Sequence, residues 1–276
     1  MKHSLEVLRL RARALGEIFR HFENPWLVTA LRFGLVRLPL FPYRIRKGAC
    51  AYEVLARPST LSLSDLFVLR EVLIEETYRD VLALLPAGPL RVVDVGGNLG
   101  TFSLWLHRQR GLKAVWCFEP EPDSYALCRF NLARNGVEGA QAIAKAMGGQ
   151  ARTIAMPRSS GRPGGVSIYG SAGSGEEATC PVEVVALAEW LGGQPGEFDL
   201  LKLDCEGAEW EILEHTPAEC FERFPVIVAE VHNDPAGRRT PDDFPRGMER
   251  LGFRTVRWDG GHMGLYLGQR AGRTAA

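Results

Sequence analysis

From residue 90 onward the chain alternates short apolar segments, typical of strands, with segments of helical periodicity. The strand-like segments are 90–95, 113–119 and, more weakly, 140–146, and the helical ones are 101–110 and 123–135. A strand–helix–strand rhythm builds a parallel sheet with right-handed crossovers, because parallel neighbours need a long connection that a helix supplies. The pattern therefore predicts a doubly wound α/β fold.

The next part of the chain breaks this rhythm and then resumes it. Residues 150–185 hold short β-like pieces, RTIAMP and VSIYG, between segments rich in glycine and serine, which indicates an inserted hairpin or meander. Beyond the insertion we expect a helix, a strand, a helix, a strand and a helix, at 186–192, at 198–204, from about 206, at 225–232 and at 243–251. The chain then closes in an antiparallel hairpin around Asp259-Gly260-Gly261.

The first strand runs directly into a loop with almost no side chains, VGGNLG at 95–100. In a doubly wound sheet, ligands bind at the carboxyl ends of the strands, and glycines there let a ligand approach the backbone. A dinucleotide loop reads G-x-G-x-x-G, so counting from Gly96 it needs glycine where this chain has Asn98 and Thr101. The spacing therefore disfavours an NAD-dependent oxidoreductase.

Carboxylates stand at the ends of the first two strands. Asp94 would repel a phosphate at close range, but it suits a ligand that carries a positive amino group. Glu119, 25 residues further along, lies where an acid accepts hydrogen bonds from both hydroxyls of a ribose. Taken singly, Asp94 could be a helix-capping acid and Glu119 a surface acid. Together they indicate a ligand with an adenosine, an ammonium and no phosphate, which is S-adenosylmethionine.

The stretches VVDVGGNLGTFSL, CFEPEPDSYALCRFNLARNG and DLLKLDCEGAEWEIL resemble the FkbM family of S-adenosylmethionine-dependent methyltransferases. The similarity covers about residues 60–268 and leaves the first 50 residues out. It implies a class I methyltransferase fold, Rossmann-like, and usually methylation of a hydroxyl on a sugar, glycolipid or other natural product. Many members carry alanine at the position of Gly97, a departure that leaves cofactor binding undisturbed. The expected cofactor-binding residues are Asp94, Gly96, Gly97, Asn98, Gly100, Glu119 and Asp204.

The resemblance implies that the fourth strand of this fold lies beside the first and the fifth beside the fourth. Side chains alternate along a strand, so Lys202 and Asp204 share a face, as do Glu230 and His232. Methyl transfer requires the acceptor oxygen, the methyl carbon and the sulfur in line, and an alcohol acceptor gains from a base. We expect His232 to be that base because of its ordinary pKa, with Asp204 or Glu230 as orienters or alternatives and Lys202 paired with an acid.

Alternatives stay open at this site. Asp204, Glu230 and His232 could hold a divalent metal such as Mg²⁺ that polarises the acceptor oxygen, although no tight metal spacing supports this. His232 could also be a structural histidine, and Glu206 and Glu209 could simply suit a helix N-terminus. The rival function is a catalytically inactive methyltransferase fold that acts as a binding or scaffold protein.

The first 55 residues read as a basic, helical extension, and residues 56–276 as the methyltransferase domain. Residues 1–50 carry ten Lys or Arg against three Glu, a net charge of +7 (10 − 3) in a chain whose total is zero. An apolar helical stripe is formed by Leu5, Leu8, Ala12, Leu15 and Phe19. It predicts a helix that covers one face of the domain, which we favour, or one that contacts a membrane surface or a partner.

Composition and charge narrow the expected class of acceptor and the expected cell compartment. A net charge of zero gives no sign of bulk nucleic-acid binding, so we expect a small-molecule or glycan hydroxyl acceptor. Six scattered cysteines without a C-x-x-C pair, and no visible signal peptide, indicate a reduced, cytoplasmic protein without structural zinc. The apolar run at 26–41 is interrupted by two arginines and a proline and is too short to span a bilayer. A helix is expected from Ser64 to Leu85.

Overall fold

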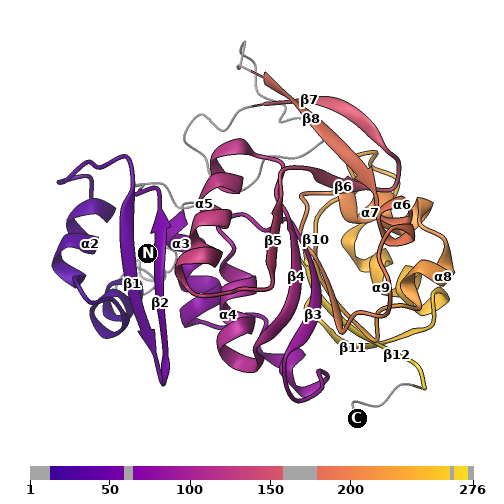
Figure 1. The fold of residues 1–276 in the computed structure, drawn as a ribbon, viewed down its shortest axis with the longest axis horizontal. Helices are drawn as coiled ribbons and strands as arrows, with labels where there is room; N and C mark the ends of the chain where they lie inside the picture. Colours follow the sequence, from indigo (N-terminus) through magenta and orange to yellow (C-terminus); the bar gives the residue numbers. More distant parts are fainter. Residues whose placement is uncertain (1–12, 59–64, 158–178, 262–263, 273–276) are drawn as a thin grey trace, which may run out of the picture. The chain divides into compact units, whose positions relative to one another are not determined.

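The computed structural model describes residues 13–58, 65–157, 179–261 and 264–272 (Figure 1). The chain divides into two compact units, and the main boundary lies between Thr77 and Tyr78. This boundary lies further along the chain than the one expected at residue 55. No helix among the described residues is long and apolar enough to cross a bilayer.

Helices and a β-hairpin make up the first unit. A helix over residues 13–21 leads to α2 (Pro25–Arg32), and β1 (Phe41–Lys47) then pairs antiparallel with β2 (Cys50–Ala56). The extension was expected to be helical, so the hairpin is a correction. In the sequence FPYRIRK, Phe41, Tyr43 and Ile45 are buried, whereas the residues between them, Pro42 and Arg44, and then Arg46, are exposed. A period of two is the pattern of a strand with one buried face.

The buried face of the first helix differs from the expected apolar stripe. Leu5, Leu8 and Ala12 lie outside the described residues. Ile18 and Phe22 are buried, whereas Phe19, which the stripe included, is 43% exposed. Phe22 bridges to Ile45 of β1, so contact with the hairpin decides which face of the helix turns inward.

The single helix expected over 64–85 is in fact interrupted. Helix α3 (Asp65–Leu69) continues as the π-helix η1 (Arg70–Ile74), and a separate 3₁₀ turn, η2 (Arg79–Ala83), follows in the second unit. Between them Glu76 has a φ of +55°, a left-handed conformation that ends a helix. The apolar periodicity continues across this break, which is why the sequence pattern did not reveal it.

A seven-stranded sheet forms the centre of the second unit (Figure 1). Its spatial order is β11 (Phe253–Trp258), β12 (Gly264–Arg270), β10 (Val226–Val231), β9 (Leu200–Leu203), β3 (Leu90–Val95), β4 (Leu112–Phe118) and β5 (Ala140–Ile143). The strands from β10 to β5 are parallel, and β12 runs antiparallel to both of its neighbours. This confirms the mostly parallel sheet with a C-terminal hairpin, and β9 lies between β3 and β10 as expected.

Helices cover both faces of this sheet. Figure 1 shows α4 (Thr101–Arg110) and α5 (Pro122–Arg134) on one side and α6 (Leu187–Gly192), α7 (Ala208–His215) and α8 (Ala218–Phe221) on the other. The 3₁₀ turn η3 (Pro241–Asp243) leads into α9 (Phe244–Arg250), which packs with α7 around Trp210. Strands buried on both faces read as continuous apolar runs, as the sequence does here.

The insertion forms a small sheet of its own. Strands β7 (Arg152–Pro157) and β8 (Thr179–Ala186) pair antiparallel, which agrees with the expected hairpin. The unexpected member is β6 (Ala146–Gly148), which adds to β8 in parallel. It takes the end of the strand expected at 140–146, and the piece VSIYG lies outside the described residues.

Candidate active site

The glycine loop is fixed between the ends of three strands. The backbone N–H groups of Gly96 and Gly97 both donate to the carbonyl of Phe118, at 3.0 and 2.9 Å. Gly96 has a φ of +78°, and a Cβ atom built there would lie 1.7 Å from the carbonyl oxygen of Asp204. Gly100 is the N-cap of α4. Close packing of strand ends therefore requires glycine at position 96, whatever ligand approaches the loop.

A buried ion pair lies beneath this loop. The Lys202 ammonium is 3.2 Å from Oδ1 of Asp94 and 3.2 Å from Oδ2 of Asp204, and it donates to the carbonyl of Gly96 at 2.6 Å. Ser103 donates to the other oxygen of Asp94 at 2.6 Å. Burial alone would lower the pKa of Lys202, but the carboxylates of Asp204 and Asp94 raise it above its ordinary value. Lys202 is therefore a permanent cation.

Asp94 was expected to bind the cofactor. Its side chain is fully buried, and a positive charge that it meets is the ammonium of Lys202. The expectation that Lys202 pairs with an acid is confirmed. At 2% exposure Lys202 is too buried to meet an acceptor, so both residues act by holding the loop and Asp204 in place.

Glu119 ties the glycine loop to the end of β4. Its two carboxylate oxygens accept backbone N–H bonds from Asn98 at 2.7 Å and from Glu121 at 2.9 Å. A carboxylate has about four acceptor positions, so roughly two remain for the hydroxyls of a ribose. Burial raises the pKa of Glu119 to about 7, so its charge changes near neutral pH.

Asn98 adds an unused acceptor beside this carboxylate. Its side-chain oxygen is buried and accepts no hydrogen bond from any residue that the structure describes. An orphaned buried polar atom is costly unless a ligand or water meets it. The loop, Glu119 and Asn98 thus fit an adenosine with ribose hydroxyls, which is the part of S-adenosylmethionine expected here.

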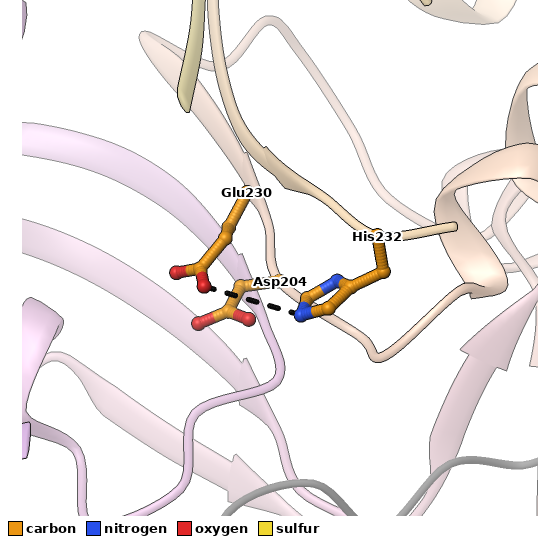
Figure 2. Close-up of side chains that lie close together, drawn as sticks. All are labelled: Asp204, Glu230 and His232. Atoms are coloured by element: carbon orange, nitrogen blue, oxygen red, sulfur yellow. Dashed lines mark ion pairs between the residues drawn. The ribbon is translucent and has the colours of Figure 1, made fainter. Parts of the chain in front are cut away.

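The expected catalytic side chains meet at the carboxyl ends of β9 and β10. Asp204, Glu230 and His232 each bring one ligand atom into a group whose atoms lie within 4.8 Å of one another. Figure 2 shows the imidazole turned towards both carboxylates, and Nε2 of His232 is 3.9 Å from Glu230. Alternation along β10 brings Glu230 and His232 to one side, as the sequence indicated.

His232 is also held from the α7 side. Its Nδ1 lies 3.3 Å from Glu209, and its Nε2 lies 3.5 Å from Glu206. Glu209 is fully buried and accepts the backbone N–H groups of Cys205 at 2.6 Å and Gly207 at 2.8 Å. The carboxylate of Glu209 therefore organises the turn into α7 and orients the imidazole at the same time.

This environment overturns the expected pKa of His232. Burial alone would lower the pKa, but Glu209, Asp204 and Glu206 raise it to about 10. At neutral pH the side chain is an imidazolium, which has no lone pair with which to accept a proton. The cluster offers its proton-accepting capacity through the carboxylates of Glu230 and Asp204 instead.

Several residues that position the site were not predicted from the sequence. Glu209 was interpreted only as an acid suited to a helix N-terminus, yet it is the closest charged partner of His232. Trp210 donates its indole N–H to the carbonyl of His232 at 2.8 Å, and Ser103 bonds Asp94. The run DCEGAEW contained the relevant pattern, because Glu206 and Glu209 flank the turn at Gly207. Their partner, His232, follows another strand, so the pattern alone did not reveal the contact.

Residues 94–255 match the model of a known family, described as the methyltransferase FkbM domain. The chain belongs to the FkbM methyltransferase family. The match starts at Asp94 and includes the glycine loop at 95–100 and the acidic cluster, which is Asp204, Glu206, Glu209, Glu230 and His232. The chain is accordingly an S-adenosylmethionine-dependent methyltransferase, as the resemblance of the three sequence stretches implied.

Curated relatives agree with this assignment to the FkbM family. The chain is 27% identical over 198 residues to Methyltransferase 1 of Beauveria bassiana (strain ARSEF 2860), covering 65% of this chain and 78% of the relative. It is 28% identical over 202 residues to Methyltransferase sdnD of Sordaria araneosa, covering 63% and 76%.

Solved structures give more distant matches to this FkbM methyltransferase. The precorrin-6y C5,15-methyltransferase of Geobacter metallireducens GS-15 is 12% identical, with a TM-score of 0.42, covering 71% of this chain and 88% of that one. The Pyrococcus abyssi tRNA (uracil-54, C5)-methyltransferase in complex with S-adenosyl-L-homocysteine is 15% identical, with a TM-score of 0.43, covering 84% and 43%.

Proposed function

We propose that this FkbM methyltransferase methylates a hydroxyl oxygen of a small-molecule or glycan acceptor. The observation that carries the proposal is the convergence of Asp204, Glu230 and His232 within 4.8 Å, at strand ends next to the glycine loop. Proton acceptors in that place suit an acceptor that must lose a proton, as an alcohol does when it is methylated. The proposed acceptors are sugars, glycolipids and other hydroxylated natural products.

The cofactor is held by the loop between β3 and α4 and by the end of β4. Glu119 accepts hydrogen bonds from the ribose hydroxyls, and the side-chain oxygen of Asn98 is a further acceptor. Asp204 contacts the loop at Gly96, on the side of the loop that faces Glu230 and His232. Lys202 and Asp94 keep this frame rigid from below. S-adenosylmethionine, when bound, supplies an electrophilic methyl group on a sulfonium.

Glu230 is the proposed proton acceptor. Both carboxylates face a cation, but Asp204 lies 3.2 Å from the Lys202 ammonium, whereas Glu230 lies 3.9 Å from Nε2 of His232 and is held less tightly. The acceptor oxygen gains positive charge as its bond to carbon forms, and the hydroxyl then becomes acidic enough to lose its proton to a carboxylate. The proton passes from the hydroxyl to Glu230, and the imidazolium of His232 holds the surrounding carboxylates in position.

The role of the remaining residues is alignment and charge balance. Four carboxylates, Asp204, Glu206, Glu209 and Glu230, surround one imidazolium and one ammonium, so the cluster is net negative and favours a sulfonium nearby. Holding the oxygen, carbon and sulfur in line accounts for much of the expected acceleration. The scattered cysteines support the further proposal that the enzyme works in the reducing cytoplasm.

The direct test is to identify the atom that receives the methyl group. The full chain is incubated with isotopically labelled S-adenosylmethionine and a panel of hydroxylated sugars, glycolipids and polyketides, and labelled products are mapped by NMR. The proposal predicts a methyl ether together with stoichiometric release of S-adenosylhomocysteine. A label on nitrogen or carbon would overturn O-methylation.

A non-catalytic scaffold gives a different outcome in the same experiment. It would bind S-adenosylmethionine, seen as a thermal shift, without releasing S-adenosylhomocysteine in the presence of any acceptor. An NAD-dependent enzyme, which the loop spacing disfavours, would instead be stabilised by NAD and not by S-adenosylmethionine.

A further inference from the structure

The first unit exposes a concentration of large apolar side chains. Of the eleven that are exposed among the described residues, eight lie between residues 19 and 40. We call this set the apolar patch: Phe19, Trp26, Leu27, Phe33, Leu35, Val36, Leu38 and Leu40. Trp26 is 76% and Leu35 is 80% exposed. Isolated exposed apolar residues are ordinary, but a concentrated set marks an interaction surface.

Helix α2 is apolar on two opposite faces. Val28 and Leu31 are buried in the unit and form its inner face. Trp26 and Phe33 are seven residues apart, two helical turns, so they share the outer face, where they are 76% and 60% exposed. The ring of Trp26 meets that of Phe19 edge-on, with centroids 4.7 Å apart, which extends the patch onto the first helix. An outer face of this kind is suited to an apolar environment rather than to water.

The charges of the same segment are mostly positive. Between Phe19 and Tyr52 the sequence has one acid, Glu23, which pairs with Arg44 and Arg46, and six basic residues: Arg20, Arg32, Arg37, Arg44, Arg46 and Lys47. Arg37 is exposed within the apolar patch, and Arg20 is exposed next to Phe19. Aromatic and leucine side chains flanked by arginine are the composition of segments that lie in the interface of an anionic bilayer.

We propose that the apolar patch docks this enzyme on an anionic lipid surface. Trp26, Phe33 and Leu35 enter the boundary between head groups and acyl chains, and Arg20 and Arg37 meet the lipid phosphates. In this proposal the attachment is peripheral and reversible, because side chains of the first unit enter only the interface. The inference is independent of the methyl-transfer chemistry, since it rests on the first unit alone.

Charge decides between a lipid surface and a second copy of the chain. In a two-fold symmetric dimer the same surface faces itself, so the arginines of the two copies would come together. Glu23, the one acid between Phe19 and Tyr52, already pairs with Arg44 and Arg46, so it does not offset the repulsion between the Arg20 and Arg37 side chains of two copies. An anionic lipid surface supplies the missing negative charge along with an apolar layer.

The test is co-sedimentation of the full chain with phosphatidylcholine vesicles, with and without phosphatidylserine. We expect binding to the anionic vesicles that weakens as salt increases, because surface charge attraction is screened. The double variant Trp26→Glu and Leu35→Glu should lose at least about tenfold in partition coefficient, since two apolar anchors are replaced by acids. Replacing Arg20 and Arg37 by alanine should weaken binding about fivefold per arginine.

Phe130→Glu is the matched control. Phe130 is 50% exposed on α5 of the second unit, so its replacement adds one acid, as each of the two patch substitutions does, but outside the patch. It should bind vesicles as the wild type does, and all variants should unfold at the wild-type temperature. Wild-type protein that stays in the supernatant with anionic vesicles would overturn the proposal. A dimer in light scattering that the double variant abolishes, without vesicle binding, would assign the patch to a second copy.

Discussion

Burial of the Glu119 carboxyl group affects how this residue binds the cofactor. Its pKa of about 7 means that it ionises over the neutral range, and only the carboxylate accepts hydrogen bonds from both ribose hydroxyls. Binding of S-adenosylmethionine should therefore tighten as the pH rises from 6 to 8. Glu119→Gln should weaken binding by about 1.5–3 kcal/mol and remove this dependence. Calorimetric titration at several pH values measures both effects.

The neighbours of Glu119 define what would contradict this prediction. Glu121 raises and Lys202 lowers the pKa of Glu119. A folded Glu119→Gln protein that binds the cofactor with wild-type affinity would remove Glu119 from the site. A variant that keeps the pH dependence would assign the titration to another group.

His232 makes the second prediction at this scale. With a pKa of about 10, it is already protonated at neutral pH, so the rate at saturating cofactor should show no rising limb near pH 6.5. The rate should instead fall as the pH passes through about 10, where the imidazolium loses its charge. His232→Gln should lower the rate about 10–100-fold, the value of charge-assisted hydrogen bonds, and flatten that limb. A rate that climbs up to pH 10 would show that neutral His232 is the base.

The sequence could predict which side chains meet, but not which charges compensate them. Alternation along strands placed Asp204, Glu230 and His232 correctly, because that rule needs only strand boundaries and strand order. The partner of Asp94 could not be predicted from its own strand, since the compensating ammonium of Lys202 arrives from β9. The pKa of His232 likewise depends on Glu209, which comes from the turn into α7.

At the scale of elements, the turn from β3 into α4 depends on Gly96. Its left-handed φ and the contact with the backbone of Asp204 leave no room for a Cβ atom. Gly96→Ala should therefore lower the free energy of unfolding by about 2–4 kcal/mol, through backbone strain and displacement of β9. Urea unfolding measures this change, with Gly48→Ala as the control, because Gly48 also has a positive φ but nothing lies near its Cβ position. Equal losses in both variants would mean that strain alone explains the effect.

The ends of β9 and β10 supply donors that also fit a divalent cation. Two carboxylates and one imidazole are adequate ligands for one, yet the imidazole here carries a proton and the Lys202 ammonium is 3.2 Å from Asp204. We therefore expect methyl transfer to survive treatment with EDTA and to gain nothing from Mg²⁺. Loss of activity on chelation that Mg²⁺ restores would contradict Glu230 as the sole activator and favour a metal that polarises the acceptor oxygen.

Elements were predictable where periodicity and stop signals agree. Helix α4 begins at Thr101 and ends at Arg110 as expected, because a glycine stands at each end. The break near Glu76 escaped prediction because the apolar pattern continues through it and a left-handed glutamate has no sequence signature. Strands β1 and β2 were not predicted, because the extension was interpreted from its basic charge and its apolar run rather than from the period of two in these strands.

At the scale of the whole molecule, the candidate active site and the proposed lipid-binding surface lie in different units. The FkbM match covers residues 94–255 of the second unit, which holds the glycine loop and the acidic cluster. The chain up to Thr77 lies outside that match and carries the proposed lipid-binding surface. Variants of the apolar patch should therefore change vesicle binding without changing the affinity for S-adenosylmethionine.

The most direct test of the account as a whole is to compare cofactor binding with single-turnover methyl transfer in Glu230→Gln. The variant keeps the shape of the side chain but cannot accept a proton as a carboxylate does. We expect nearly the wild-type dissociation constant for S-adenosylmethionine, because Glu119 and the loop hold the cofactor. We expect a methyl-transfer rate lower by about 10²–10⁴, the usual contribution of acid–base catalysis. A wild-type rate in Glu230→Gln would contradict the proposed chemistry, and a loss of cofactor binding would contradict the placement of the two sites.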